Sequence, residues 1–179
     1  VDDVFDIHAI VKFLIQSILA GWVVFWLKGE VLITIVWLPW FISYFVSWFF
    51  LVWMMNLYNF MDGVDGMAAS GAIFFSLALI VILLMSGVFS NLVLLFALLA
   101  LSCGGFLFYN WPPASIFMGD SGSIFLGYLF GALIIKTINS GDISIWTWIV
   151  IFGYFFADTN LTLILRILFV KKWYHAHKS

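Results

Sequence analysis

Six long apolar runs dominate this sequence and restrict what it can fold into. Each has about the 17 to 25 residues that a helix needs to cross the hydrocarbon core of a bilayer. Unbroken runs indicate helices, because the strands of a membrane barrel would alternate apolar and polar residues. The runs lie near residues 9–27, 31–55, 67–88, 92–109, 122–138 and 143–165. The sequence therefore predicts an all-α, polytopic transmembrane protein with six spans, in which Pro39 kinks the second.

The composition also indicates a lipid environment. Hydrophobic residues make up 65% of the chain and charged residues 9%, whereas a soluble domain is roughly half apolar and a quarter charged. The net charge of −2 gives no reason to expect a nucleic-acid partner. Cys103 is the one cysteine, and we expect it to be a packing residue.

No linker, internal repeat or low-complexity segment divides the chain. We therefore expect a single integral membrane domain over residues 1–179. The chain begins at Val1 rather than at a methionine, and its last residues, HAHKS, do not read as a natural end. We expect a fragment of a longer protein.

Acidic residues gather on one face of the predicted bundle. Because successive spans alternate in direction, the start of the chain, the connectors at 59–66 and 109–121 and the tail share that face. Seven of the nine acidic residues lie on it or approach it, namely Asp2, Asp3, Asp6, Asp62, Asp65, Asp120 and Asp158. This asymmetry is the main organisational feature of the sequence.

Basic and aromatic residues orient that face. More basic residues lie near it than near the opposite face, so the positive-inside rule makes it cytoplasmic. These basic residues are Lys12, Arg166, Lys171, Lys172 and Lys178. The opposite interface is expected to carry an aromatic belt of Trp22, Trp26, Trp146 and Trp148.

The acidic clusters VDDVFD and DGVDG place like charges close together. Helix capping can account for one Asp per helix, but not for this crowding. Mg²⁺ is usually held by one or two carboxylates together with phosphate oxygens. The glycine-containing stretches 63–69 and 119–123 begin two of the spans and can offer backbone N–H groups to phosphate. These features predict a diphosphate site with Mg²⁺, or alternatively Mn²⁺.

Cationic side chains near the same face are further candidates. Asp158 and Arg166 are about two helical turns apart and can both line the pocket. The alternative is a buried Asp158 paired with another helix and an Arg166 that snorkels. His175 and His177 stand in a basic tail that either faces phosphate or meets anionic lipid headgroups.

Two other motif assignments fail. A calcium-binding EF-hand that starts at Asp62 needs a glutamate at its twelfth position, which is Ile73. The stretch GDSGS lacks the lysine of a P-loop. In the fifth span, Gly127 and Gly131 form a GxxxG pattern that predicts a close helix contact.

Several motifs together resemble one family. NLYNFMDGVDG (56–66), FMGDSGS (117–123), the leading pair Asp2 and Asp3 and the histidine-containing tail resemble the polyprenyl-phosphate N-acetylhexosamine-1-phosphate transferases. This glycosyltransferase family 4 contains phospho-MurNAc-pentapeptide translocase and the initiating enzymes of O-antigen and teichoic acid synthesis. Such proteins have about ten helices of spanning length, so the resemblance implies that N-terminal helices and the extreme C-terminus are missing here. The tail HAHKS lacks the adjacent histidines of the peptidoglycan enzyme, which favours the O-antigen-initiating branch.

The resemblance implies an enzyme and a reaction. A UDP-amino sugar would give its sugar 1-phosphate to polyprenyl (undecaprenyl) phosphate and release UMP. The reaction would be Mg²⁺-dependent and would open cell-surface polysaccharide synthesis, such as that of lipopolysaccharide or the cell wall. The site would lie on the cytoplasmic face of the bacterial inner membrane, and a homodimer is left open.

The resemblance also implies roles for individual residues. The catalytic residues would be Asp2, Asp3, Asp62, Asp65, His175 and His177. The metal ligands would be Asp120, as the chief ligand, and Asp62. The substrate-binding residues would be Asn56, Asn59, Phe117, Gly119, Ser121 and Arg166. Among these, Phe117 would stack near the uracil, and Asp2 and Asp3 would face the lipid phosphate.

Two rival functions make different demands on the sequence. A phosphotransferase of the CDP-alcohol type should show an Arg shortly after the first DG and a further GxxxDxxxD, and DGVDGMAASGAIFF has neither. A cation transporter should place its acidic residues at mid-membrane depth on broken helices. Here the acidic residues are predicted at one interface.

Overall fold

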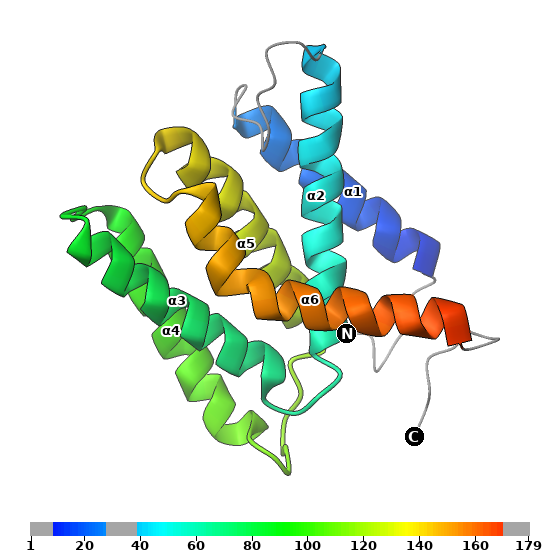
Figure 1. Cartoon of the computed structure of the whole chain (residues 1–179). Helices are drawn as coiled ribbons and strands as arrows, with labels where there is room; N and C mark the ends of the chain where they lie inside the picture. The colour runs from blue at the N-terminus through cyan, green and yellow to red at the C-terminus, as the bar shows by residue number, and fades with distance from the viewer. Residues whose placement is uncertain (1–8, 28–38, 170–179) are drawn as a thin grey trace.

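The computed structural model describes residues 9–27 and 39–169, with side chains described as far as Thr162. Within these ranges the backbone forms helices and no strand, which confirms the all-α prediction. The helices are α1 (Ala9–Trp26), α2 (Trp40–Met61), α3 (Met67–Met85), α4 (Asn91–Asn110), α5 (Gly119–Ser140) and α6 (Ile145–Phe169) (Figure 1).

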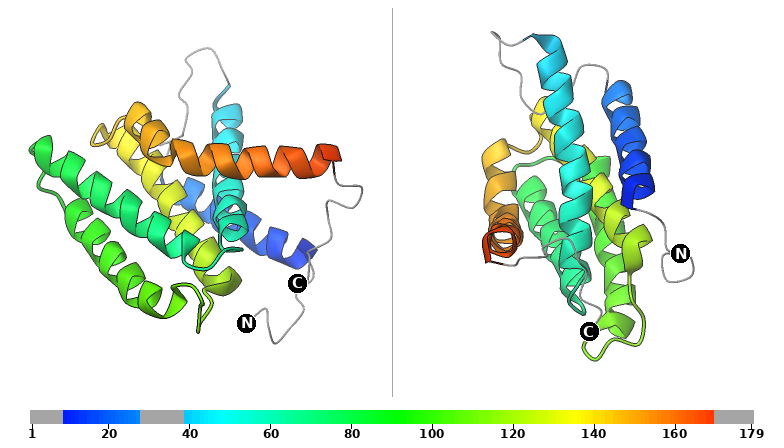
Figure 2. Two further views of the ribbon diagram at one scale, coloured as in Figure 1. Left: turned by 60° about the horizontal axis from the view of Figure 1, so that its bottom comes forward. Right: turned by 90° about the vertical axis from the view of Figure 1, so that its right-hand side faces the viewer.

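The apolar helices, together with the relatives described below, make this a multi-pass membrane protein, and within the described residues four of the six predicted spans are long and apolar enough to cross. By length and composition α2, α3, α4 and α5 can each cross a membrane, and the apolar part of α1 is shorter. Helix α6 bends near its middle, so that its first part returns beside α5 and its second part runs across α2 (Figures 1 and 2). The second part contains the polar run Asp158, Thr159 and Asn160, which is costly to expose to lipid.

Helix α2 differs from its predicted bounds at both ends. Pro39 stands at the N-cap position, so the predicted kink at this residue is wrong. Proline lacks a backbone N–H and suits the start of a helix, where that group has no intrahelical acceptor. At its other end α2 continues to Met61, six residues beyond residue 55. Asn56 and Asn59 therefore lie on a helix rather than at the edge of a loop.

Helices α2 and α5 pack backbone against backbone, and the site is built at their ends. A methyl group at Gly127 would lie 2.7 Å from the Cα atom of Met55, and closer still to the carbonyl oxygen of Met54. At Gly131 the nearest atom, 3.0 Å away, belongs to the Leu51 side chain. The two backbones thus touch at Gly127, which confirms the predicted close contact at the GxxxG pattern.

Aromatic side chains fill the core on the other side of α2. Phe75 of α3 stacks on Phe152 of α6 with ring centroids 3.9 Å apart, and Tyr58 stacks on Phe130 of α5 at 5.6 Å. Cys103 is buried in the same cluster, as predicted for a packing residue. This cluster fixes where the ends of α2 and α5 lie.

The acidic connectors meet at one end of the bundle. The segments 62–66 and 111–118 lie together at the lower end of Figure 1, and the α5–α6 connector with Asp142 lies at the opposite end. Trp22, Trp26 and Trp146 are exposed, in keeping with the predicted belt. Trp148 is 2% exposed and donates a 2.9 Å hydrogen bond to Thr137, so its assignment to the belt is wrong.

Candidate active site

The motifs at 56–66 and 117–123 contact each other through Asn59 and Asp120. Asn59 lies in the last turn of α2, and Asp120 lies in the first turn of α5. The Asn59 side-chain Nδ2 donates to Asp120 Oδ1 at 2.6 Å and to Ser123 Oγ at 3.1 Å. A carboxylate in the first turn is also favoured by the helix dipole. The sequence motifs, 61 residues apart, therefore form one site.

Helix α1 adds a cation to this site. The Lys12 Nζ lies 2.6 Å from Asp120 Oδ2, and the two side chains are 32% and 28% exposed. Because both groups are partly desolvated, their attraction is stronger than that of a surface ion pair. Sequence reasoning placed Lys12 near this face but assigned it no role.

A second polar contact ties α1 to α2 one turn further into the bundle. Asn56 Nδ2 donates to Gln16 Oε1 at 2.9 Å and to the Val52 carbonyl at 2.7 Å. Gln16 is 4% exposed, so this amide pair satisfies groups that would otherwise be buried without partners. Asn56 thus faces α1. Gln16 and Ser123 are site-supporting residues that the sequence analysis did not predict.

Asp62 is the second carboxylate beside Asp120. It caps the C-terminus of α2, where its backbone N–H donates to the Tyr58 carbonyl at 3.1 Å. Burial raises the pKa of its side chain to about 6, a backbone hydrogen bond from Gly119 opposes this rise, and the Asp120 charge adds to it. Two carboxylates that interact in this way attract a divalent cation.

The DGVDG loop is fastened to the loop before α5. Asp65 Oδ2 accepts from the Ala114 N–H at 3.1 Å, and Gly66 N–H donates to Asn110 Oδ1 at 2.9 Å. Asn110 Nδ2 in turn donates to the Ile116 carbonyl at 2.8 Å. Gly66 has φ +76°, a conformation that suits glycine. The structure therefore shows Asp65 holding the 111–118 loop, and its predicted catalytic role stays a prediction.

Three other predicted residues line the exposed side of the site. Phe117 is 71% exposed in the loop that leads into α5. Gly119 and Ser121, in the first turn of α5, are also exposed. An exposed ring beside a helix N-terminus is a suitable surface for a planar base and its attached phosphates.

The remaining predictions fall where the structure is not described. Asp2, Asp3, His175 and His177 lie outside the described residues. Arg166 belongs to the second part of α6, where its side chain is not described. Asp158, on the same helix, is partly buried.

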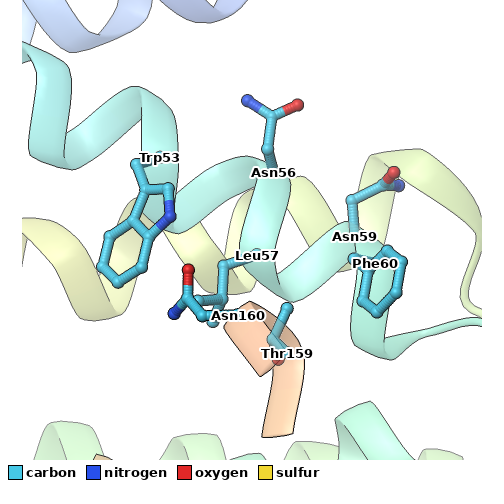
Figure 3. A pocket seen from close by; sticks show the side chains of 7 residues that line it. All are labelled: Trp53, Asn56, Leu57, Asn59, Phe60, Thr159 and Asn160. Carbon is cyan, nitrogen blue, oxygen red and sulfur yellow. The ribbon is translucent and has the colours of Figure 1, made fainter. Parts of the chain in front are cut away.

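A cavity of about 300 Å³ adjoins the site between α2 and α6. Its lining mixes aromatic, aliphatic and amide side chains (Figure 3). They are Trp53, Asn56, Leu57, Asn59 and Phe60 of α2 and Thr159 and Asn160 of α6. Because Asn59 also donates to Asp120, the cavity is linked to the Asp120 carboxylate through this one side chain.

The ligand set suits Mg²⁺ that arrives with a phosphate. Among the side chains that the structure describes, no group of three or more His, Cys, Asp or Glu could hold a metal ion. Asp120 and Asp62, with the amide of Asn59, nevertheless provide the one or two carboxylates with which Mg²⁺ is usually held alongside water and substrate phosphates. We therefore retain Asp120 and Asp62 as the candidate ligands.

Comparisons with known proteins identify the family of the chain. The family model "Glycosyl transferase family 4" matches residues 1–138. A probable undecaprenyl-phosphate N-acetylglucosaminyl 1-phosphate transferase of Bacillus subtilis is 35% identical over 93% of this chain and 48% of its own length. Phospho-N-acetylmuramoyl-pentapeptide-transferases of Desulforamulus reducens and Phenylobacterium zucineum are 33% and 37% identical over 75% and 79% of this chain.

The chain spans 38% and 43% of those last two relatives, and thus less than half the length of each of the three. Both kinds of sugar occur in the relatives' names, so the preference for the O-antigen branch stays a prediction. The match of the family model over more than half of the chain is decisive. The chain belongs to glycosyl transferase family 4, the polyprenyl-phosphate hexosamine-1-phosphate transferases.

Proposed function

We propose that the complete protein transfers an N-acetylhexosamine 1-phosphate from a UDP-sugar to undecaprenyl phosphate and releases UMP. The observation that carries this proposal is the contact between Asn59 and Asp120. It brings the two motifs of the family together with Asp62 and Lys12 at one end of the bundle. The relatives' printed names supply the reaction class. The site would face the cytoplasm of a bacterial plasma membrane.

The chemistry joins two anions. An oxygen of the lipid phosphate attacks the sugar-linked phosphorus of the UDP-sugar, and the bond from that phosphorus to the bridging oxygen of UMP breaks. Mutual repulsion of the phosphates is the first barrier, and a bound Mg²⁺ would supply positive charge against it. Lys12 adds a positive charge within the same site. Asn59 orients the Asp120 carboxylate through its 2.6 Å hydrogen bond.

Positioning accounts for the remaining residues. The exposed ring of Phe117 would stack on the uracil, and the exposed start of α5 would meet the diphosphate through Gly119 and Ser121. A phosphate monoester is already largely ionised near pH 7, since its second pKa is about 6. The acceptor therefore does not need a strong general base, and we assign Asp65 a positioning role at the 111–118 loop.

The cavity between α2 and α6 supports a lipid acceptor. Trp53, Leu57 and Phe60 give it an apolar wall, and its polar groups come from Asn56, Asn59, Thr159 and Asn160, of which Asn59 is bonded to Asp120. An isoprenoid phosphate likewise combines an apolar chain with an anionic head. We place the first isoprenoid units along this wall, with the phosphate next to Asn59.

The test is UMP release by the complete protein in membranes that contain undecaprenyl phosphate and Mg²⁺. UDP-N-acetylglucosamine, UDP-N-acetylfucosamine and UDP-N-acetylquinovosamine are supplied separately, and one of them should release UMP. Asp120→Asn should abolish release. Asp142→Asn, an equivalent change at the opposite end of the bundle, should have no effect. The proposal is wrong if no UDP-sugar releases UMP, or if Asp120→Asn stays within about twofold of wild type.

A further inference from the structure

We propose that Lys12 couples the binding of a divalent cation to the binding of a diphosphate. The Lys12 ammonium holds Asp120 before ligands bind and moves to phosphate oxygens when the cation and the diphosphate enter. Lys12 is then a positioning residue that acts through Asp120. The inference rests on the proposed function, because it takes a nucleoside diphosphate as the ligand.

The Asp120 carboxylate is engaged at both oxygens. Asn59 Nδ2 lies 2.6 Å from Oδ1, and Lys12 Nζ lies 2.6 Å from Oδ2. Mg²⁺ binds its oxygen ligands at about 2.0–2.1 Å. A dication on Oδ2 would therefore lie only about 4 Å from an ammonium at its present place, and the two would repel strongly in this partly desolvated site. The cation and the ammonium compete for Asp120.

The Lys12 ammonium can leave Asp120 without movement of α1. Further along α1, Gln16 Oε1 accepts from Asn56 at 2.9 Å, and the backbone carbonyl of Ser17 accepts from the Trp48 indole N–H at 3.0 Å. These contacts hold α1 against α2. The lysine side chain has a flexible four-carbon stem, and that of Lys12 is 32% exposed. The ammonium can therefore change its partner by rotation about side-chain bonds while the backbone stays fixed.

A coupling of two binding events follows from this competition. A cation that binds alone must displace the ammonium from Asp120, and the attraction between these two groups is then lost. A diphosphate that binds with the cation offers the displaced ammonium new anionic oxygens. Each ligand therefore improves the site for the other, and by linkage the two improvements are equal. An ammonium that served only as a structural tie between α1 and α5 would not produce this effect.

The experiment measures Mn²⁺ affinity, with and without UDP, by electron paramagnetic resonance of the complete protein in nanodiscs. A protein-free titration corrects for the Mn²⁺ that UDP binds in solution. In wild type, UDP should tighten Mn²⁺ binding by about tenfold, within the usual range of coupled sites. Lys12→Met should bind Mn²⁺ alone about tenfold more tightly than wild type and should show a smaller effect of UDP, because only the direct attraction between the cation and the phosphates then remains.

Three further variants complete the test. Lys12→Arg keeps the charge and should retain the effect of UDP. Lys12→Gln repeats the loss of charge with a polar side chain, in case Lys12→Met folds poorly. Lys136→Met removes a lysine that lies on α5 about four turns from Asp120, and this variant should behave as wild type.

The outcomes separate this inference from the proposed function. The inference is overturned if UDP does not tighten Mn²⁺ binding in wild type, or if a well-folded Lys12→Met or Lys12→Gln protein keeps the wild-type coupling. The UMP-release assay is run on the same samples. Transfer without Lys12-dependent coupling would refute the inference alone. Lys12-dependent coupling without transfer from any UDP-sugar would support it and refute the proposed reaction.

Discussion

Replacing Gly127 with alanine should force α2 and α5 apart and disable the site that lies at their ends. The added methyl group would stand 2.7 Å from the Met55 Cα and 2.9 Å from the Met54 carbonyl carbon. Both are backbone atoms of a helix, so neither can rotate away. The helices must therefore separate by about 1 Å to restore van der Waals contact.

The expected cost follows from this geometry. Overpacking of this kind costs about 1–3 kcal/mol, and we expect the upper end because no side chain can yield. Asn59 belongs to α2, whereas Asp120 and Ser123 belong to α5, so the same shift strains the 2.6 and 3.1 Å bonds that join them. A misplacement of about 1 Å in such a constellation can reduce kcat/KM about 100-fold.

Two other glycines provide matched controls. At Gly131 the closest atom is the Leu51 Cδ2 at 3.0 Å, a side-chain atom that can move, so Gly131→Ala should cost about 1 kcal/mol or less. Nothing lies within 4 Å of the corresponding position at Gly105, and Gly105→Ala should be neutral or slightly stabilising. The assays are thermal unfolding in detergent and UMP release well below the melting temperature. If Gly127→Ala and Gly105→Ala have the same melting temperature and the same rate of UMP release, the predicted separation of α2 and α5 is refuted.

Three more results are expected. Because its pKa is raised from 3.8 to about 6, folded Asp62 retains its proton between these pH values. Without divalent cations the protein should then lose thermal stability as the pH rises through this window, while cation affinity should increase. Asp62→Asn should remove both trends. A wild-type pH profile in this variant would show that Asp62 is not the group that titrates in this window. Phe117→Ala should raise the KM for the UDP-sugar about tenfold with little change in kcat, whereas Phe117→Trp should restore it; a change confined to kcat would exclude stacking. Trp148→Phe should lose the buried hydrogen bond to Thr137 and about 1 kcal/mol of stability at unchanged kcat, as measured by thermal unfolding, and unaltered stability would show that this bond contributes nothing.

The apolar runs located α3 and α4 to within three residues at each end. The predicted runs 67–88 and 92–109 compare with α3 at Met67–Met85 and α4 at Asn91–Asn110. The errors arose where polar residues belong to a helix. Asp120 lies inside the first turn of α5, and Asn56 and Asn59 lie inside the end of α2, because partners on other helices satisfy them. An apolar run also carries no information about direction, and so the bend of α6 could not be predicted.

The sequence motifs brought Asn59, Asp62 and Asp120 into one predicted site, and the structure places these three residues together. The sequence alone could not identify Lys12 as the cation beside Asp120. Lys12 and Gln16 are one turn apart on an otherwise apolar helix, which was a usable signal that this side of α1 meets polar groups. Their partners are far away in the sequence, 108 residues in the case of Asp120. Such pairings depend on how the helices pack and not on any local pattern.

The buried amide of Asn110 has a consequence for the nucleotide binding that we propose. It accepts a hydrogen bond from the residue before α3 and donates one to the segment that carries Phe117. The α2–α3 connector and the α4–α5 connector are therefore held in a fixed position relative to each other. The spacing between an aromatic platform and the neighbouring carboxyl groups is thereby fixed when the chain folds. An incoming nucleotide would meet a surface that is already assembled, and little ordering would be left for the moment of binding.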